Sequence, residues 1–462
     1  MAVERVSPDD LMQRALDVGP LPMHVGAVLV LGAAVDLDRA RQGLGERIGA
    51  VPRMRQRLVR TPLGCGGPIW VDDVTFDLSR HVTAVGCPSP GDEAALLEVA
   101  VQSYTQELPM DRPLWRATLI TGLAEGRSAL VLVVHHMLAD GFGGLALLSG
   151  LADGSPTIAR PFPRPRPSRR VLAADSWRSR VSGLTRTLAS LATLRPAARE
   201  LGGAPRAAAC SLNQRLHPRL RVLLVRAEVP SVLTAARSRG GTLNDAVLAA
   251  VGGALGNLLE LRGEEVRHLV ISVPVTGGSP DASAPDARVV NRVGVMPVAV
   301  PVTGPRRLER IAEITRARKS AARGSSSALT RPAFRLLAAI GVLRWLIRRQ
   351  RMVNTFVTNV RGPERRLALL GAEVTDILPL GTVSGNVTVA FTVLSYAGTM
   401  TVAIAADPVA CPDVDGLRAL LQGELDDLVG RDGDTRWNAG RSVSSRAIEV
   451  TARRRPDRTV ER

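Results

Sequence analysis

Two spacings of hydrophobic residues alternate along the chain, one typical of buried strands and the other of amphipathic helices. In the first half, apolar runs predict strands at 24–31, 115–121 and 128–134, and a helical spacing predicts helices at 36–48, 92–106 and 171–200. In the second half, the predicted strands are 221–229, 269–275 and 293–302, and the predicted helices are 232–239, 242–259 and 413–428. A hairpin is predicted from 387–393 and 399–405, around Ser395-Tyr-Ala-Gly398.

A segment of proline and arginine separates the two halves. Residues 155–170 read SPTIARPFPRPRPSRR, and we expect an extended crossover there because this composition does not hold a helix or a sheet. Strands and helices mixed in both halves indicate an α/β fold whose two layers face each other across a substrate cleft. The predicted division is an N-terminal domain (1–154), a crossover linker with helices (155–204), a C-terminal domain (205–435) and a disordered basic tail (436–462).

The composition is globular and suits two domains: of the 462 residues, 45% are hydrophobic and 22% are charged. No run is long and apolar enough to span a membrane, and the first residues, MAVERVSPDD, carry no secretory signal, so we expect a cytoplasmic protein. The four cysteines lie far apart, match no metal spacing and are expected to stay reduced.

The formal net charge is +17, and every basic residue except Lys319 is an arginine. Three segments, 155–170, 331–351 and 436–462, contribute +16 of this charge. Aromatic residues make up only 3% of the chain, which disfavours a stacking platform for nucleic acid. An anionic membrane surface or a phosphate-bearing ligand fits the basic segments better, and a solvated tail without a partner is the alternative.

An apolar stretch, LLAAIGVLRWLI at 336–347, lies inside the second basic segment. It is too short to span a bilayer and is flanked by arginines on both sides. Two interpretations fit this pattern. The first is a helix lying at a membrane interface with its arginines reaching the head groups, and the second is a buried core helix with a charged end.

Candidate chemistry is concentrated in seven residues, HHMLADG at 135–141, between the apolar runs 129–134 and 142–148. The pattern predicts a buried strand, a tight polar turn and a helix. His135 and His136 point to opposite faces of an extended strand, so only one imidazole can enter a pocket, and a metal site using the pair is disfavoured. Whichever imidazole enters the pocket can accept a proton near neutral pH. In the simplest interpretation both histidines are core residues and Asp140 is a helix N-cap.

Together with other motifs, this stretch resembles the bacterial wax ester synthase/acyl-CoA:diacylglycerol acyltransferase family, from near the first residue to about residue 430. HHMLADG matches the family's HHxxxDG motif, Pro113-Leu114-Trp115 its PLW motif, and Asn244-Asp245 its ND motif. Condensation domains of peptide synthetases share HHxxxDG, but the order of all the motifs is specific. Further similarity lies in PMHVG (22–26), FD (76–77) with His81, PGD (90–92), VNR (290–292), TNV and GP (358–363), and SYAG (395–398).

The resemblance implies two chloramphenicol-acetyltransferase-like α/β domains around a central tunnel, with the HHxxxDG turn at its middle. It also implies transfer of a long-chain acyl group from acyl-CoA, a substrate and not a cofactor, to diacylglycerol or a long-chain alcohol. No cofactor, metal or nucleic acid is expected. A peripheral position at the inner membrane face or on lipid inclusions, through 331–351, would bring the enzyme to its acceptor.

The same resemblance implies roles for single residues. His136 is the expected general base, and His135, Asp140 and Gly141 complete the catalytic motif, the last two by shaping the turn. Asn244, beside Asp245, is a candidate donor to the oxyanion, and the alternative is a residue that only starts the helix near Thr242. For Pro113, Leu114 and Trp115 a structural or tunnel-lining role is expected. Tyr396 is a candidate for lining the tunnel or for packing of the hairpin.

Two other functions were weighed. One is a stand-alone condensation-type acyltransferase that takes its acyl donor from a carrier protein; the chain itself carries no carrier domain with a Gly-Gly-x-Ser site. The other is a lipid-surface protein that has kept the fold and lost activity. Such a protein would be expected to have replaced His136 or Asp140, and both are present.

Overall fold

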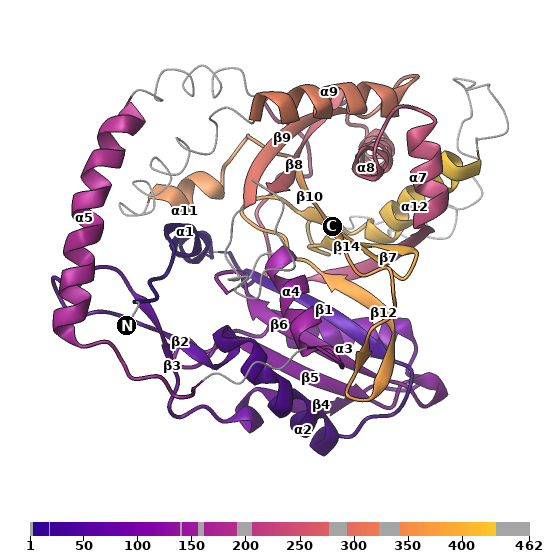
Figure 1. Ribbon diagram of the computed structural model, residues 1–462. Helices are drawn as coiled ribbons and strands as arrows, with labels where there is room; N and C mark the ends of the chain where they lie inside the picture. The colour runs from indigo at the N-terminus through magenta and orange to yellow at the C-terminus, as the bar shows by residue number, and fades with distance from the viewer. Residues whose placement is uncertain are drawn as a thin grey trace, which may run out of the picture.

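Two six-stranded sheets form the frame of the molecule (Figure 1). The computed structural model describes residues 3–17, 19–138, 141–155, 161–191, 206–276, 293–322 and 342–430. The first sheet has the order β11-β12-β1-β6-β5-β4, and the second has the order β7-β14-β13-β10-β8-β9. A short hairpin of β2 (Gln56–Val59) and β3 (Ile69–Asp72) stands apart from both. The expected α/β fold with two layers is therefore confirmed.

The first sheet is mainly antiparallel, and β1 and β6 lie at its centre. One of its pairs, β4 with β5, is parallel. Its strands are β1 (His24–Leu31), β4 (Val82–Gly86), β5 (Trp115–Thr121), β6 (Ser128–His135), β11 (Ala368–Leu369) and β12 (Ala372–Leu380).

In the second sheet β10 runs parallel to both of its neighbours, β8 and β13, and the other pairs are antiparallel. Its strands are β7 (Arg221–Glu228), β8 (His268–Thr276), β9 (Val293–Pro301), β10 (Thr355–Arg361), β13 (Val389–Tyr396) and β14 (Thr399–Ala406). The predicted hairpin around Ser395-Tyr-Ala-Gly398 is present as β13 and β14, with Ala397 and Gly398 in the left-handed region at its turn.

Helices α7, α8, α9 and α12 lie beside the second sheet, α2 lies beside the first, α3 and α4 contact strands of both sheets, and α5 stands at one edge of the molecule (Figure 1). None of those in the described ranges is both long and apolar enough to cross a bilayer. Their bounds are α1 (Pro8–Leu16), α2 (Leu37–Arg47), α3 (Glu93–Thr105), α4 (Gly141–Leu151), α5 (Arg169–Leu191), α7 (Val229–Arg237), α8 (Leu243–Leu261), α9 (Arg307–Ala322), α11 (Val342–Ile347) and α12 (Val414–Gly430).

Two predicted boundaries were wrong near prolines and arginines. The helix expected at 232–239 begins three residues earlier, because Pro230 fits the first turn of α7, where its missing N–H is not needed. The crossover expected at 155–170 ends sooner, since Arg169 and Arg170 already belong to α5. Residues 161–168 form neither helix nor strand. The predicted elements at 192–200 and 331–341 lie outside the described residues, as does the tail beyond 430.

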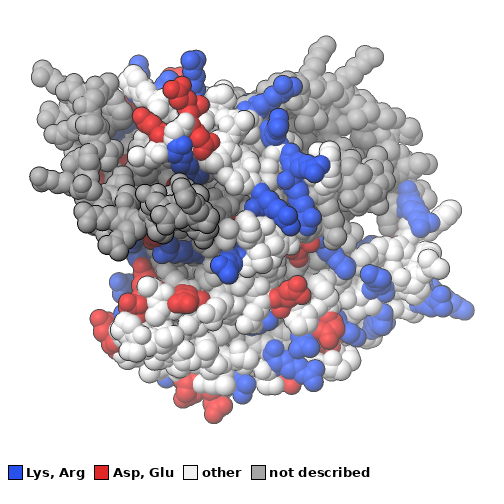
Figure 2. All heavy atoms as spheres, turned by 180° about the vertical axis from the view of Figure 1, so that it is seen from behind, with Lys and Arg blue, Asp and Glu red and all other residues white. Residues whose placement is uncertain are grey.

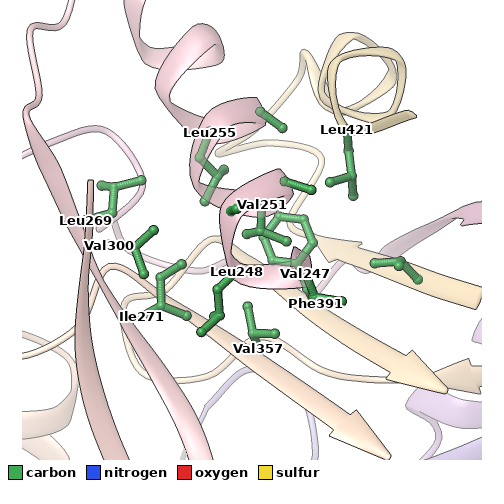
Figure 3. Close-up of a cluster of buried hydrophobic side chains, with 14 of the residues drawn as sticks. Val247, Leu248, Val251, Leu255, Leu269, Ile271, Val300, Val357, Phe391 and Leu421 are labelled. Atoms are coloured by element: carbon green, nitrogen blue, oxygen red, sulfur yellow. The ribbon is translucent and has the colours of Figure 1, made fainter. Parts of the chain in front are cut away.

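The core of the second sheet is built on α8, which is buried along almost its whole length (Figure 3). Its valines and leucines point onto the sheet, where they meet Ile271, Val357 and Phe391. A Cβ on Gly252 would lie 2.6 Å from the Val300 side chain, so glycine is needed where this helix approaches β9. The helix begins with a capping box between Thr242 and Asp245.

The first sheet has a core on each face. One face packs against α2 and α4. The other face packs against α3 and against β7 and β14, the strands at one edge of the second sheet. Burial of the second sheet's edge in this core joins the two sheets into one body.

The chain also crosses between the sheets. Residues 368–380, which the sequence division placed in the C-terminal domain (205–435), form β11 and β12 of the first sheet. There β12 pairs with β1 in antiparallel register, with Val28 opposite Leu378. The pairing follows from the apolar ILPL end of β12, which is buried against the first sheet.

Tyr396 connects the second sheet to the segment that crosses into the first sheet. It closes β13 of the second sheet, and its buried hydroxyl accepts the Leu367 N–H (2.7 Å) and donates to the Val374 carbonyl (2.8 Å) on β12. Of the two roles considered for Tyr396, packing at the hairpin is the one that the structure supports.

We therefore expect Tyr396→Phe to destabilise the protein by about 1–3 kcal/mol, because it leaves a half-buried amide and a buried carbonyl without this partner. Chemical unfolding of the purified variant measures this loss. Phe391→Leu, which disturbs packing in the neighbouring core without removing a hydrogen bond, separates the two effects. A Tyr396→Phe protein as stable as the parent would contradict the assignment.

Candidate active site

The histidine pair stands where β6 ends. Every residue of β6 is buried, and a turn at 136–138 leads toward α4, which begins at Gly141. Strands on both sides hold this turn: the His135 N–H donates to the Leu114 carbonyl, and the His136 N–H donates to the Met23 carbonyl, both at 3.0 Å. Met137 and Leu138 then insert into the core under α4. The predicted strand and turn are thus present, and the turn is fixed through its backbone.

The two imidazoles have different surroundings, as the strand geometry predicted. His135 is 4% exposed, whereas His136 is half-buried. The His135 Nδ1 accepts the Met137 N–H (3.0 Å), so its proton must reside on Nε2, which donates to Asp17 Oδ2 (3.2 Å). Both ring nitrogens of His135 are therefore engaged in hydrogen bonds at the turn.

Beneath the turn lies a buried polar cluster that joins His135 to three further residues. Asp17 closes α1, His24 opens β1, and Tyr104 lies on α3. His24 Nδ1 donates to the Tyr104 carbonyl (2.8 Å), and the Tyr104 hydroxyl donates back to the His24 carbonyl (2.7 Å). Gly26 makes room for this exchange, since a Cβ there would lie 2.8 Å from the Tyr104 ring.

Burial sets the charge state of this cluster. It lowers the pKa of His24 to about 4, against the opposing effect of the hydrogen bond to Tyr104. For Asp17 burial alone would raise the pKa, but the hydrogen bonds from His135 and from the Met23 N–H outweigh burial and lower it. Near neutral pH the cluster therefore holds a neutral His24 and an ionised Asp17.

The PLW residues support the turn from the other side. Pro113, Leu114 and Trp115 are all buried, and the Leu114 carbonyl accepts the His135 N–H. The Trp115 indole donates to the Met54 carbonyl (2.7 Å) and stacks on His81, with ring centroids 4.6 Å apart. These contacts are structural, which was one of the two roles expected for this motif.

The ND residues lie in the first turn of α8. Asp245 is buried and accepts hydrogen bonds from Thr242, both through its N–H (2.8 Å) and its hydroxyl (2.7 Å), and from the Thr315 hydroxyl (2.7 Å) on α9. Its carboxylate caps α8 and ties it to α9. Asn244, beside it, has a half-buried side chain.

Asp140 lies outside the described residues, and of Gly141 only the backbone, at the start of α4, is described. Across the described ranges, no three His, Cys, Asp or Glu side chains come close enough to hold a metal ion. Asp17 and Tyr104 were missed by the sequence analysis. His24 entered it only within PMHVG, which was the one available signal for this cluster.

Two family models match the chain. One, described as the wax ester synthase/diacylglycerol acyltransferase catalytic domain, matches residues 6–247, and the second, the WS/DGAT C-terminal domain, matches residues 290–429. The chain belongs to the wax ester synthase/diacylglycerol acyltransferase family. As a member of it, the protein is an acyltransferase.

Relatives with known names agree with this assignment. A probable diacylglycerol O-acyltransferase of Mycobacterium tuberculosis (strain H37Rv) is 32% identical over 415 residues, which span 83% of this chain and 86% of the relative. A putative diacylglycerol O-acyltransferase of Mycobacterium bovis matches to the same extent.

Solved structures share the fold. The wax ester synthase/diacylglycerol acyltransferase of Marinobacter aquaeolei VT8 matches with a TM-score of 0.64 and 22% identity, over 92% of this chain and all of that one. The first condensation domain of the calcium-dependent antibiotic synthetase matches with a TM-score of 0.63 and 18% identity, over 94% of this chain and 98% of that one. The predicted two-domain acyltransferase fold is thus confirmed.

The low pKa of His24 makes stability depend on pH. Below its ordinary pKa of 6.5, the unfolded chain takes up a proton that folded His24 accepts only near pH 4, so stability falls as the pH falls between these values. The full loss is about 3 kcal/mol. In His24→Asn, whose amide can still donate to the Tyr104 carbonyl, we expect the melting temperature to fall less between about pH 7 and about pH 5.

Differential scanning fluorimetry of the parent and variant at both pH values measures this effect. His217→Asn, at a half-exposed histidine in the second half of the chain, is the control. Equal falls in the parent and in His24→Asn would contradict the prediction.

Proposed function

We propose that this enzyme transfers a long-chain fatty acyl group from acyl-CoA to the hydroxyl of diacylglycerol, of a long-chain alcohol, or of both. The products are then triacylglycerol or wax ester. Family models on both halves of the chain and the mycobacterial relatives support this proposal. The observation that carries it is the histidine turn, where His135 is buried with both ring nitrogens hydrogen-bonded and the backbone of His136 is fixed by a hydrogen bond to Met23.

His136 acts as the general base in this proposal. As the alcohol oxygen attacks the thioester carbonyl, His136 takes the hydroxyl proton, a C–O bond forms, and the C–S bond then breaks. The proton passes from His136 to the departing thiolate, whose thiol has a pKa near ~8.5 and leaves readily. No covalent acyl-enzyme is needed. A base held in place for this transfer contributes about 10²–10⁴-fold to the rate.

Other residues have supporting roles in the proposal. Asn244 is the proposed donor to the oxyanion of the tetrahedral intermediate, and Asp140 and Gly141 shape the turn. Exclusion of water from a tunnel between the sheets would protect the thioester from hydrolysis. The alternative, a condensation-type enzyme that uses a carrier-bound donor, has only a likeness of fold in its favour.

We also propose that the enzyme docks on anionic membranes or lipid inclusions through residues 331–351. Of these, 342–351 are described: α11 packs beside α1, its Trp345 is 57% exposed, and the Arg349 guanidinium lies over the Trp345 ring (5.2 Å). Figure 1 places α11 on the side of the molecule where α5 stands. On that side, at the right of Figure 2, basic side chains predominate over acidic ones. An exposed tryptophan with arginines suits the head-group region of a bilayer.

The role of His136 is tested by release of CoA from palmitoyl-CoA, with diacylglycerol and a long-chain alcohol offered separately. We expect acceptor-dependent release by the parent, and a rate about 10²–10⁴-fold lower in His136→Ala. His217→Ala controls for loss of an unrelated imidazole. Undiminished release by a folded His136→Ala protein would overturn the mechanism. Turnover of an acyl-carrier protein in preference to acyl-CoA would instead support the alternative donor.

Membrane docking is tested by flotation with vesicles of phosphatidylglycerol and of phosphatidylcholine. We expect the parent to float with the anionic vesicles and to be released by salt, and a variant with Trp345→Ala, Arg349→Gln and Arg351→Gln to float less. The matched control, Leu261→Ser with Arg237→Gln and Arg418→Gln, removes exposed groups of the same kinds from the second half of the chain. Equal flotation of both variants with the parent would rule out this surface.

A further inference from the structure

Asp17 connects the end of α1 to both sides of the histidine turn. One carboxylate oxygen, Oδ1, accepts the Met23 N–H (3.0 Å), and the other, Oδ2, accepts the His135 Nε2–H (3.2 Å). The carboxylate is largely buried, with 25% of the side chain exposed. Its lowered pKa keeps it ionised near neutral pH, so both oxygens remain acceptors.

The two partners of Asp17 are the groups that hold His136. The Met23 carbonyl accepts the His136 N–H, and the His135 Nδ1 accepts the Met137 N–H, so the peptide groups before and after the His136 side chain are both tied down. We propose that Asp17 is a positioning residue for acyl transfer, acting through Met23 and His135 on the place of His136. This inference rests on the proposed function, in which His136 is the base.

A carboxylate is required at this position because both partners are donors. Asparagine has one carbonyl oxygen and one NH₂ group, so it can accept from Met23 or from His135 but not from both. If its NH₂ group faced His135, the ring proton would have to move from Nε2 to Nδ1. A proton on His135 Nδ1 would face the Met137 N–H, so the hydrogen bond from Met137 to His135 would be lost. Asp17→Asn therefore loses the hydrogen bond from Met23 or the one from His135, whichever way the amide lies.

The expected effect falls on the chemical step. Displacement of a catalytic group by about 1 Å can lower a rate ~10²-fold, so we expect kcat of Asp17→Asn to fall ~10–100-fold. The KM for acyl-CoA should stay within about twofold, because no substrate contact is removed. Asp17→Glu, which keeps two acceptor oxygens, should recover part of the lost kcat.

A second variant removes the hydrogen bond between Asp17 and His135 by changing His135. In His135→Asn the side-chain oxygen can still accept the Met137 N–H, while the shorter side chain no longer reaches Asp17. We expect its kcat to fall as well, and the double variant with Asp17→Asn to be no slower than the slower single variant, since both break one link. Should Asp17→Asn fail to fold, His135→Asn alone decides: a folded protein with the parent's kcat would overturn the inference.

Asp407 provides a matched control in the second half of the chain. It is fully buried and accepts from His217 through both the backbone N–H (2.7 Å) and Nδ1 (3.1 Å). Asp407→Asn removes the same chemistry away from the histidine turn. We expect it to lower the melting temperature and to leave kcat per folded molecule unchanged.

Failure of this inference is distinguishable from failure of the proposed function. If His136→Ala abolishes acyl transfer while folded Asp17→Asn keeps the parent's kcat, Asp17 is not a positioning residue and His136 remains the base. If folded His136→Ala keeps the parent's activity, His136 is not the base and the proposed mechanism fails; if the parent shows no acceptor-dependent CoA release, the proposed function itself fails. If Asp17 acts only through His136, Asp17→Asn in the His136→Ala background should change the residual rate by less than about twofold, because no base is left to position.

Discussion

The histidine turn depends on backbone hydrogen bonds from two strands that flank β6. Leu114, just before β5, accepts from His135, and Met23, just before β1, accepts from His136. Because these bonds fix the peptide groups, the position of the His136 ring is set by the sheet and not by the preference of a flexible loop. Rigid elements hold functional groups more precisely than loops do. Here the hydrogen bond from His136 to Met23 continues the pairing of β6 with β1 one residue beyond the strand.

Holding the turn in this way places polar groups in the core of the first sheet. Asp17, His24, His135 and Tyr104 would each oppose folding if buried without partners. Instead, the Asp17 carboxylate, the His24 ring, the Tyr104 hydroxyl and the His135 ring each have a hydrogen-bond partner. The ionised Asp17 and the neutral His24 follow from this arrangement, since a charge remains in the core only where donors surround it.

The sequence predicts those elements whose signal is local. β1, β5, β6 and α8 agree with prediction within two residues, since the strands are continuous apolar runs and Thr242 and Asp245 mark the start of the helix. β12 (AEVTDILPL) was not predicted, because polar residues and a proline interrupt its pattern and its burial comes from β1. Strand geometry predicted that the two histidines have different surroundings, and this is confirmed, but the choice of His136 as the base came from the family resemblance. Asp17 could not be found, because its partner His135 lies 118 residues away and nothing beside it in sequence marks the contact.

The crossing of β12 bears on how the chain can be made. Until residues 372–380 leave the ribosome, β1 is an edge strand of the first sheet, with its N–H and C=O groups unpaired along one side. The half of the enzyme that carries the histidine turn is therefore synthesised long before its sheet can close. Because an unpaired edge favours pairing with strands of other chains, a first fragment that ends before residue 372 is expected to be prone to aggregate.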